Sequence, residues 1–142
     1  MDILEGLTRE HREMEALLAE LEGSTHHLPA WEAAAKRFFH AVHRHEAAEE
    51  RILFPAIHAA SREARDCLET LEAEHRRIIE TSYNLKRALE TRDPVLVASS
   101  TTALGQLVRA HWRREEQLLF PVAGRDLSRE RLTQLTAAWE SL

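Results

Sequence analysis

The chain has 142 residues, 44% of them hydrophobic, and a formal net charge of −5 with neutral histidines. This length suits one domain with one core, and the net charge excludes a protein that binds nucleic acid through a Lys/Arg excess. Cys67 is the single cysteine, which excludes an intrachain disulfide and a cysteine-based metal cluster.

No apolar run approaches the roughly 20 residues of a membrane-spanning helix, and the chain does not begin with a basic region followed by an apolar one. We therefore expect a single domain over residues 1–142, located in the cytoplasm, with no nucleic-acid and no membrane partner. Ala, Leu, Glu and Arg dominate the sequence and favour helices.

The first predicted helix covers about residues 2 to 22. Its apolar residues and one histidine recur at steps of three and four, so they share one face. These positions are Leu4, Leu7, His11, Met14, Leu18 and Leu21. Asp2 is a suitable N-cap, and Gly23 stands where a left-handed residue often ends a helix.

The second predicted helix follows a short loop and carries its stripe from Trp31 to Ala59. His45 and Glu49 occupy positions on this stripe. Pro55 lies inside the helix, where it removes one backbone hydrogen bond and should produce a kink.

A third helix follows a break near Ser61 and carries His75 on its apolar stripe. Asp93 and Pro94 are then suited to be the N-cap and first residue of a fourth helix, whose stripe includes His111. After Gly124, a short last helix is expected at about residues 128–141.

These elements predict an all-α protein. Four amphipathic helices joined by short connections favour an antiparallel up-down-up-down four-helix bundle, over about residues 2–123, with a short C-terminal fifth helix.

Two stretches of the chain read almost alike. Residues 45–55 (HEAAEERILFP) recur as residues 111–121 (HWRREEQLLFP), and Glu10-His11-Arg12 matches Glu74-His75-Arg76. In both longer copies a His and a Glu stand four residues apart, which places them on one helix face. The repeating unit is therefore a helical hairpin.

Counting about 1.5 Å per residue from each turn brings six polar side chains to one height inside the bundle. They are His11, His45, Glu49, His75, His111 and Glu115. Burying them would be costly without compensation, and two divalent cations would supply it. Imidazole and carboxylate ligands suit iron, with manganese or zinc also possible.

The pattern of a His followed by His-x-x-x-Glu, present twice, resembles the hemerythrin-like (HHE cation-binding) family of non-haem di-iron bundles. The resemblance covers about residues 4 to 122. It implies the four histidines as terminal ligands and the two glutamates as bridging ligands of two iron ions: His11, His45, His75, His111, Glu49 and Glu115.

One position departs from the family's oxygen carriers. Those proteins have a further His four residues after the third-helix His, where this chain has Ile79. The four-His set resembles instead the bacterial members linked to oxygen, peroxide or nitric oxide chemistry.

We therefore expect a di-iron protein that binds oxygen or a related small oxidant. Two alternatives remain open: a di-iron enzyme (an oxidoreductase, peroxidase-like or an oxygenase), or a module that senses iron or oxygen for a protein partner that the sequence does not identify.

Polar residues beside the expected ligands are not expected to bind the metal. Glu46 lies about 100° off the stripe and is expected to be solvated. Glu50 and Glu116 are expected to form surface salt bridges. For Glu10 and Glu74, accepting a hydrogen bond from a ligand imidazole is the less favoured alternative.

Residues that the repeat does not match are expected to play no part in the site. Packing is favoured over a place in a ligand pocket for Tyr83. Five histidines are expected on the surface: His26, His27, His40, His43 and His58.

Overall fold

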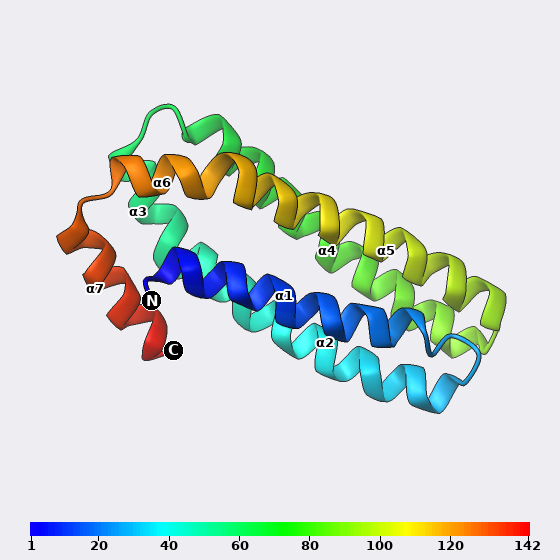
Figure 1. The fold of residues 1–142 in the computed structure, drawn as a ribbon. Helices are drawn as coiled ribbons and strands as arrows, with labels where there is room; N and C mark the ends of the chain where they lie inside the picture. Colours follow the sequence, from blue (N-terminus) through cyan, green and yellow to red (C-terminus); the bar gives the residue numbers. More distant parts are fainter.

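The computed structural model describes residues 1–142 as a bundle of helices (Figure 1). In chain order the elements are α1 (Ile3–Glu22), α2 (Leu28–Ala48), the π-helix η1 (Glu49–Leu53), α3 (Phe54–Ala60), α4 (Arg65–Thr91), α5 (Pro94–Arg114), the π-helix η2 (Glu115–Leu119), α6 (Phe120–Asp126) and α7 (Arg129–Glu140). The second and fourth helices of the bundle are thus continuous through their π-helices. The predicted all-α class and the short C-terminal helix are confirmed.

The arrangement is that of two hairpins lying side by side. One hairpin pairs α1 with α2, the other pairs α4 with α5, and α7 lies across one end of the bundle near the N-terminus (Figure 1). There the Ile3 backbone N–H donates to Thr136 Oγ1 at 2.9 Å. The Trp139 ring lies so close to Gly6 that an added Cβ would be 2.1 Å from it. Gly6 therefore allows α7 to pack closely on α1.

Side-chain caps begin α1, α5 and α7, and the caps of α1 and α5 are those that the sequence predicts. Asp2 forms a capping box with Glu5 at the start of α1, Asp93 caps α5, and Ser128 caps α7. Each cap satisfies backbone N–H groups that have no partner inside the helix.

The prediction that Gly23 is left-handed is wrong. Gly23 has φ −76° and continues a right-handed turn, in which its N–H donates to the Ala19 carbonyl. The left-handed residue is Arg92, with φ 56°, at the end of α4. Only Arg92 and Asp93 separate α4 from α5, and so short a connection requires an abrupt change of backbone direction.

A π-helix precedes each of the two prolines for which the sequence predicts a kink. The Phe54 N–H donates to the Glu49 carbonyl and the Phe120 N–H to the Glu115 carbonyl, five residues back. Pro55 and Pro121 follow, in the first turns of α3 and α6. The wider turn accommodates residues that cannot donate a backbone hydrogen bond, and both π-helices begin at a glutamate of the repeat.

Two apolar clusters occupy the two ends of the bundle. The cluster beside α7 contains, among others, Ile3, Leu7, Leu53, Phe54, Leu71, Leu119 and Phe120. The cluster at the far end contains, among others, Met14, Leu18, Trp31, Phe38, Leu85, Leu104 and Val108. The buried histidines and glutamates of the repeat belong to neither cluster and come between the two along each helix. None of the helices combines the length and the apolar character needed to cross a membrane.

Candidate metal centre

The six residues predicted as ligands come together in the middle of the bundle. Each is buried, with at most 3% of its surface exposed. They form two groups of four that share Glu49 and Glu115: one group adds His11 and His45, the other His75 and His111. Within each group the potential ligand atoms all lie within 4.8 Å of one another. Each hairpin supplies three of the six residues.

The distances inside the groups fit metal coordination. His11 Nε2 lies 3.1 Å from His45 Nε2 and 3.0 Å from Glu115 Oε1. His75 Nε2 lies 3.2 Å from Glu49 Oε1. Two nitrogens bound to one metal at about 2.1 Å, at a right angle, would be about 3.0 Å apart. The separations between donor atoms thus match those around a metal ion.

Three of the potential ligand atoms are buried and have no hydrogen-bond partner in the protein. They are Glu49 Oε2, His111 Nε2 and Glu115 Oε2. An unpaired buried polar atom is costly, and two divalent cations, one in each group, would give all three atoms a partner. The residues present therefore fit a pair of metal ions.

Each of the four imidazoles is held from outside by a carboxylate on its second ring nitrogen. The Nδ1 contacts are His11 to Glu116 at 2.9 Å, His45 to Glu10 at 2.9 Å, His75 to Glu50 at 2.9 Å and His111 to Glu74 at 3.0 Å. An ionised carboxylate only accepts hydrogen bonds, so Nδ1 donates to it. In the neutral imidazole that a metal ion requires, Nε2 then presents its lone pair to the centre.

We refer to Glu10, Glu50, Glu74 and Glu116 as the outer carboxylates. Glu50 and Glu116 are exposed and form ion pairs, as expected, but their partners are the buried histidines His75 and His11 and not other surface residues. The less favoured alternative for Glu10 and Glu74 is the one that the structure shows. The signal was in the sequence, since all four belong to the repeat.

Charge and hydrogen bonding shift the titration of the inner residues. Burial lowers the pKa of His75, but its hydrogen bond with Glu49 and the charge of Glu49 outweigh burial and raise the pKa to about 9. The pKa values of His45 and His111 are also raised, against burial, by the neighbouring glutamates. Burial raises the pKa of Glu115, yet hydrogen bonds with Glu49 and the histidines hold it well below its ordinary value.

Glu46 is buried, and the expectation that it is solvated is wrong. Only 7% of its surface is exposed, and its Oε1 has no hydrogen-bond partner. Burial raises its pKa to about 7, although the charges of His75 and His111 oppose this shift. Because α2 packs against both α1 and α4, its buried face is wider than a single stripe. The equivalent position in the repeat, Trp112, is an aromatic residue and was the available signal.

Aromatic rings cover the histidines unequally. Trp112 and Phe120 both stack on His11, with centroid distances of 5.6 and 5.9 Å. Phe54 stacks on His75 at 5.5 Å. His75 has no second stacking ring, because the repeat places Glu46 where the other copy has Trp112.

Residues outside the repeat lie mostly where the sequence predicts. The five remaining histidines are all exposed: His26, His27, His40, His43 and His58. Ile79, in the place of a further histidine, is 37% exposed. Tyr83 is 62% exposed and lines a groove between α2 and α4, so the favoured expectation that it simply packs is wrong.

Comparison with known proteins gives one family. The sequence profile described as Hemerythrin HHE cation binding domain matches residues 2–123. No curated protein matches the chain significantly.

Proposed function

Since the chain belongs to the hemerythrin HHE cation-binding family, a family of metal-binding helical domains, we propose that it is a non-haem di-iron protein that binds oxygen or a related small oxidant, such as peroxide or nitric oxide. The identity of the metal as iron, rather than manganese or zinc, and a cytoplasmic location are parts of this proposal. The residues proposed as ligands are His11, His45, Glu49, His75, His111 and Glu115.

The observation that carries the proposal is the donor set. Two imidazoles and two shared carboxylates are available to each metal ion, and iron with this kind of ligand set in other proteins keeps positions open for a small molecule. Bound ferrous ions would supply one electron each to an oxidant. No thiolate is present in either group, which argues against a closed structural zinc site.

The surrounding residues orient the proposed ligands and exclude water, and are not themselves ligands. The outer carboxylates hold the Nδ1 proton of each histidine and so keep the four Nε2 atoms directed inward. Trp112 and Phe120 stack on His11, and Phe54 stacks on His75. Together with the burial of all six inner residues, these rings would limit the access of bulk water to bound metal ions.

Metal analysis combined with anaerobic absorption spectroscopy tests the proposal. We expect about two iron ions per chain, one for each group of four residues, and a visible charge-transfer band when the ferrous protein is mixed with oxygen, peroxide or nitric oxide. A protein that retains no iron, or ferrous protein whose spectrum none of these changes, would contradict it.

Glu46 favours a second candidate, a di-iron enzyme of the oxidoreductase class. It is a buried carboxyl group that belongs to neither group of potential ligands, and it faces His75 and His111. A buried carboxyl group near the bound oxidant could transfer a proton during turnover, a role that reversible binding does not require. Steady-state consumption of peroxide or nitric oxide that is lost in Glu46→Gln, with iron content unchanged, would identify the enzyme.

A further inference from the structure

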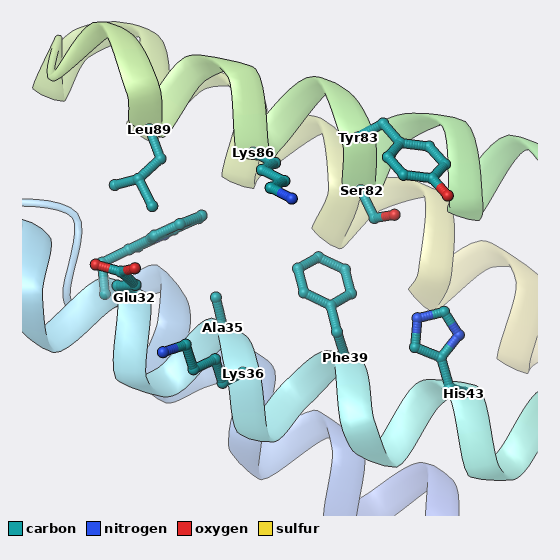
Figure 2. A pocket seen from close by; sticks show the side chains of 10 residues that line it. Glu32, Ala35, Lys36, Phe39, His43, Ser82, Tyr83, Lys86 and Leu89 are labelled. Atoms are coloured by element: carbon teal, nitrogen blue, oxygen red, sulfur yellow. The ribbon is translucent and has the colours of Figure 1, made fainter.

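A groove separate from the metal centre lies between α2 and α4 (Figure 2). Its cavity has a volume of about 310 Å³, at the lower end of the range for small-molecule sites. The residues that matter for its chemistry are Trp31, Ala35, Lys36, Phe39, Lys86 and Leu89.

Both lysines of the chain line this groove. The sequence has 19 Lys and Arg residues, of which only Lys36 and Lys86 are lysines. Several arginines form ion pairs, including Arg109 with Glu15 and Glu22. Neither lysine has a carboxylate within ion-pair distance. The groove therefore contains both lysine ammonium groups of the chain, and neither is neutralised by a carboxylate of the protein.

The remainder of the groove is largely apolar. Trp31 and Ala35 are buried, at 2% and 7% exposure, and Phe39 and Leu89 are half-buried. The Trp31 Nε1 donates to Thr101 Oγ1 at 3.1 Å, which fixes the indole ring. In Figure 2 the Phe39 ring and the Lys86 side chain extend toward each other from the two helices. Apolar surface and a cationic group thus face the same space.

We propose that this groove binds an amphipathic monocarboxylate, a free acid of about ten carbons by the size of the cavity. Its apolar chain would lie over Phe39, Ala35 and Leu89, and its carboxylate would be held by Lys36 and Lys86. This site is independent of the proposed metal chemistry.

The charges of the residues that line the groove favour a ligand with a single negative charge. Glu32 is the only acidic residue that lines the groove, so with histidine neutral the lining residues carry two positive charges and one negative charge. A carboxylate neutralises the remaining positive charge, whereas a phosphate monoester would leave an excess of negative charge on a chain that already carries −5. An ammonium-bearing ligand would be repelled.

Size argues against a protein partner. A stable interface typically involves about 20 to 30 residues on each partner, whereas 10 residues line this groove. The groove also stops short of the candidate metal centre, because none of the six inner residues lines it. A ligand seated on the lysines would therefore not contact the inner histidines.

The scarcity of lysine makes a direct test possible. Reductive methylation with ¹³C-formaldehyde keeps the ammonium charge and yields two lysine signals by NMR, in addition to that of the terminal amine. We expect both lysine signals to shift when decanoate is added below its micelle concentration. Decan-1-ol and decyltrimethylammonium, which lack the carboxylate, should leave them unchanged.

Substitution identifies the site. The double variant Lys36→Gln, Lys86→Gln should weaken decanoate binding, measured by calorimetry, by about tenfold or more, as expected for charge-assisted hydrogen bonds. Arg87→Gln is the matched control, because Arg87 is exposed on the same helix and does not line the groove. It should bind decanoate like the original chain.

Any of the following results would overturn the proposal: no lysine shift with decanoate, equal shifts with the uncharged alcohol, unchanged affinity in the double variant, or a change in the visible spectrum of the iron-loaded protein without a lysine shift. The last would place the carboxylate at the metal centre. Self-association of the chain that the double variant abolishes would assign the groove to a second copy and would overturn it equally.

Discussion

The two hairpins of the bundle carry the same proposed ligands in different surroundings. In each, a Glu-His pair on one helix faces a His and a Glu on the next, and a π-helix begins at that Glu. The positions that differ lie beside the ligands. Glu46 in the first hairpin corresponds to Trp112 in the second, and Ala48 corresponds to Arg114.

These differences make the two groups of ligands unequal. Two rings, Trp112 and Phe120, stack on His11. Only one ring, Phe54, stacks on His75, which also has the buried carboxyl group of Glu46 nearby. The duplication has preserved the atoms that would bind metal and has varied the dielectric and charge around them. Two metal ions bound here are therefore expected to differ in affinity and in the ligands that they accept.

The shared glutamates are the strongest test of this arrangement. Glu115 belongs to both groups, so Glu115→Ala should reduce iron from about two ions per chain toward none. His45→Ala and His111→Ala each remove a ligand of one group only and should leave about one ion. Iron per chain, measured on purified protein, separates the two results.

His43→Ala is the control for these variants, because His43 is exposed and two residues before His45. It should retain the iron content of the original chain. If all four variants lost iron equally, the assignment of ligands to two groups that share Glu115 would be wrong.

The second prediction concerns the protein after its metal has been removed with a chelator. The pKa of His75 is raised from the ordinary 6.5 to about 9 by Glu49. Below pH 6.5 the histidine is protonated in the folded and unfolded states, and its full stabilisation is present. As pH rises toward 9, the folded state alone still holds the proton, so stability is lost.

The free energy of unfolding should accordingly fall by at most about 3 kcal/mol between pH 6.5 and 9, measured by urea unfolding. Metal binding shows the opposite trend, because the imidazoles must lose their protons to bind an ion. The iron-loaded protein should therefore lose little stability over this range. A metal-free protein that gains stability with pH would show that the inner histidines are not paired with the glutamates.

The sequence predicts the six inner residues because they obey two simple rules, the helical period and equal height in an up-down bundle. The sequence does not predict that Glu50 and Glu116 bond to the inner histidines. Both glutamates lie inside π-helices, where a period of 3.6 residues no longer describes the direction of side chains. The sequence prediction fails for Glu46 because burial there depends on packing against two neighbouring helices. The presence of Lys36 and Lys86 in one groove also depends on how α2 packs on α4, which no local pattern encodes.

Glu46→Gln tests the difference between the hairpins directly. In the folded chain burial raises the pKa of Glu46 from 4.5 to about 7. The folded state holds more protons than the unfolded state between these values, so stability falls as pH rises across them, and the full cost of the buried charge remains above pH 7. The variant should therefore stabilise the metal-free protein by about 1 to 2 kcal/mol at pH 8 and have little effect at pH 4.5.

Urea unfolding at the two pH values measures this effect. Glu72→Gln is the matched control, since Glu72 is exposed and forms no ion pair. A similar gain in both variants would mean that the chain responds to net charge and not to the burial of Glu46.

The smallest expected effect distinguishes the outer carboxylates of the two hairpins. Glu74 is 11% exposed in its side chain and also accepts a hydrogen bond from Arg114 Nε at 3.1 Å, whereas Glu50 is 49% exposed. Removing a carboxylate that orients a ligand histidine typically weakens metal binding about 10- to 100-fold. Water can replace the exposed carboxylate of Glu50 more readily than the buried one of Glu74. Glu74→Ala should therefore weaken ferrous iron binding about tenfold more than Glu50→Ala in competition with a chelator of known affinity. Equal losses of affinity in the two variants would show that packing orients the imidazole, and that the Arg114–Glu74 ion pair does not help Glu74 to hold His111.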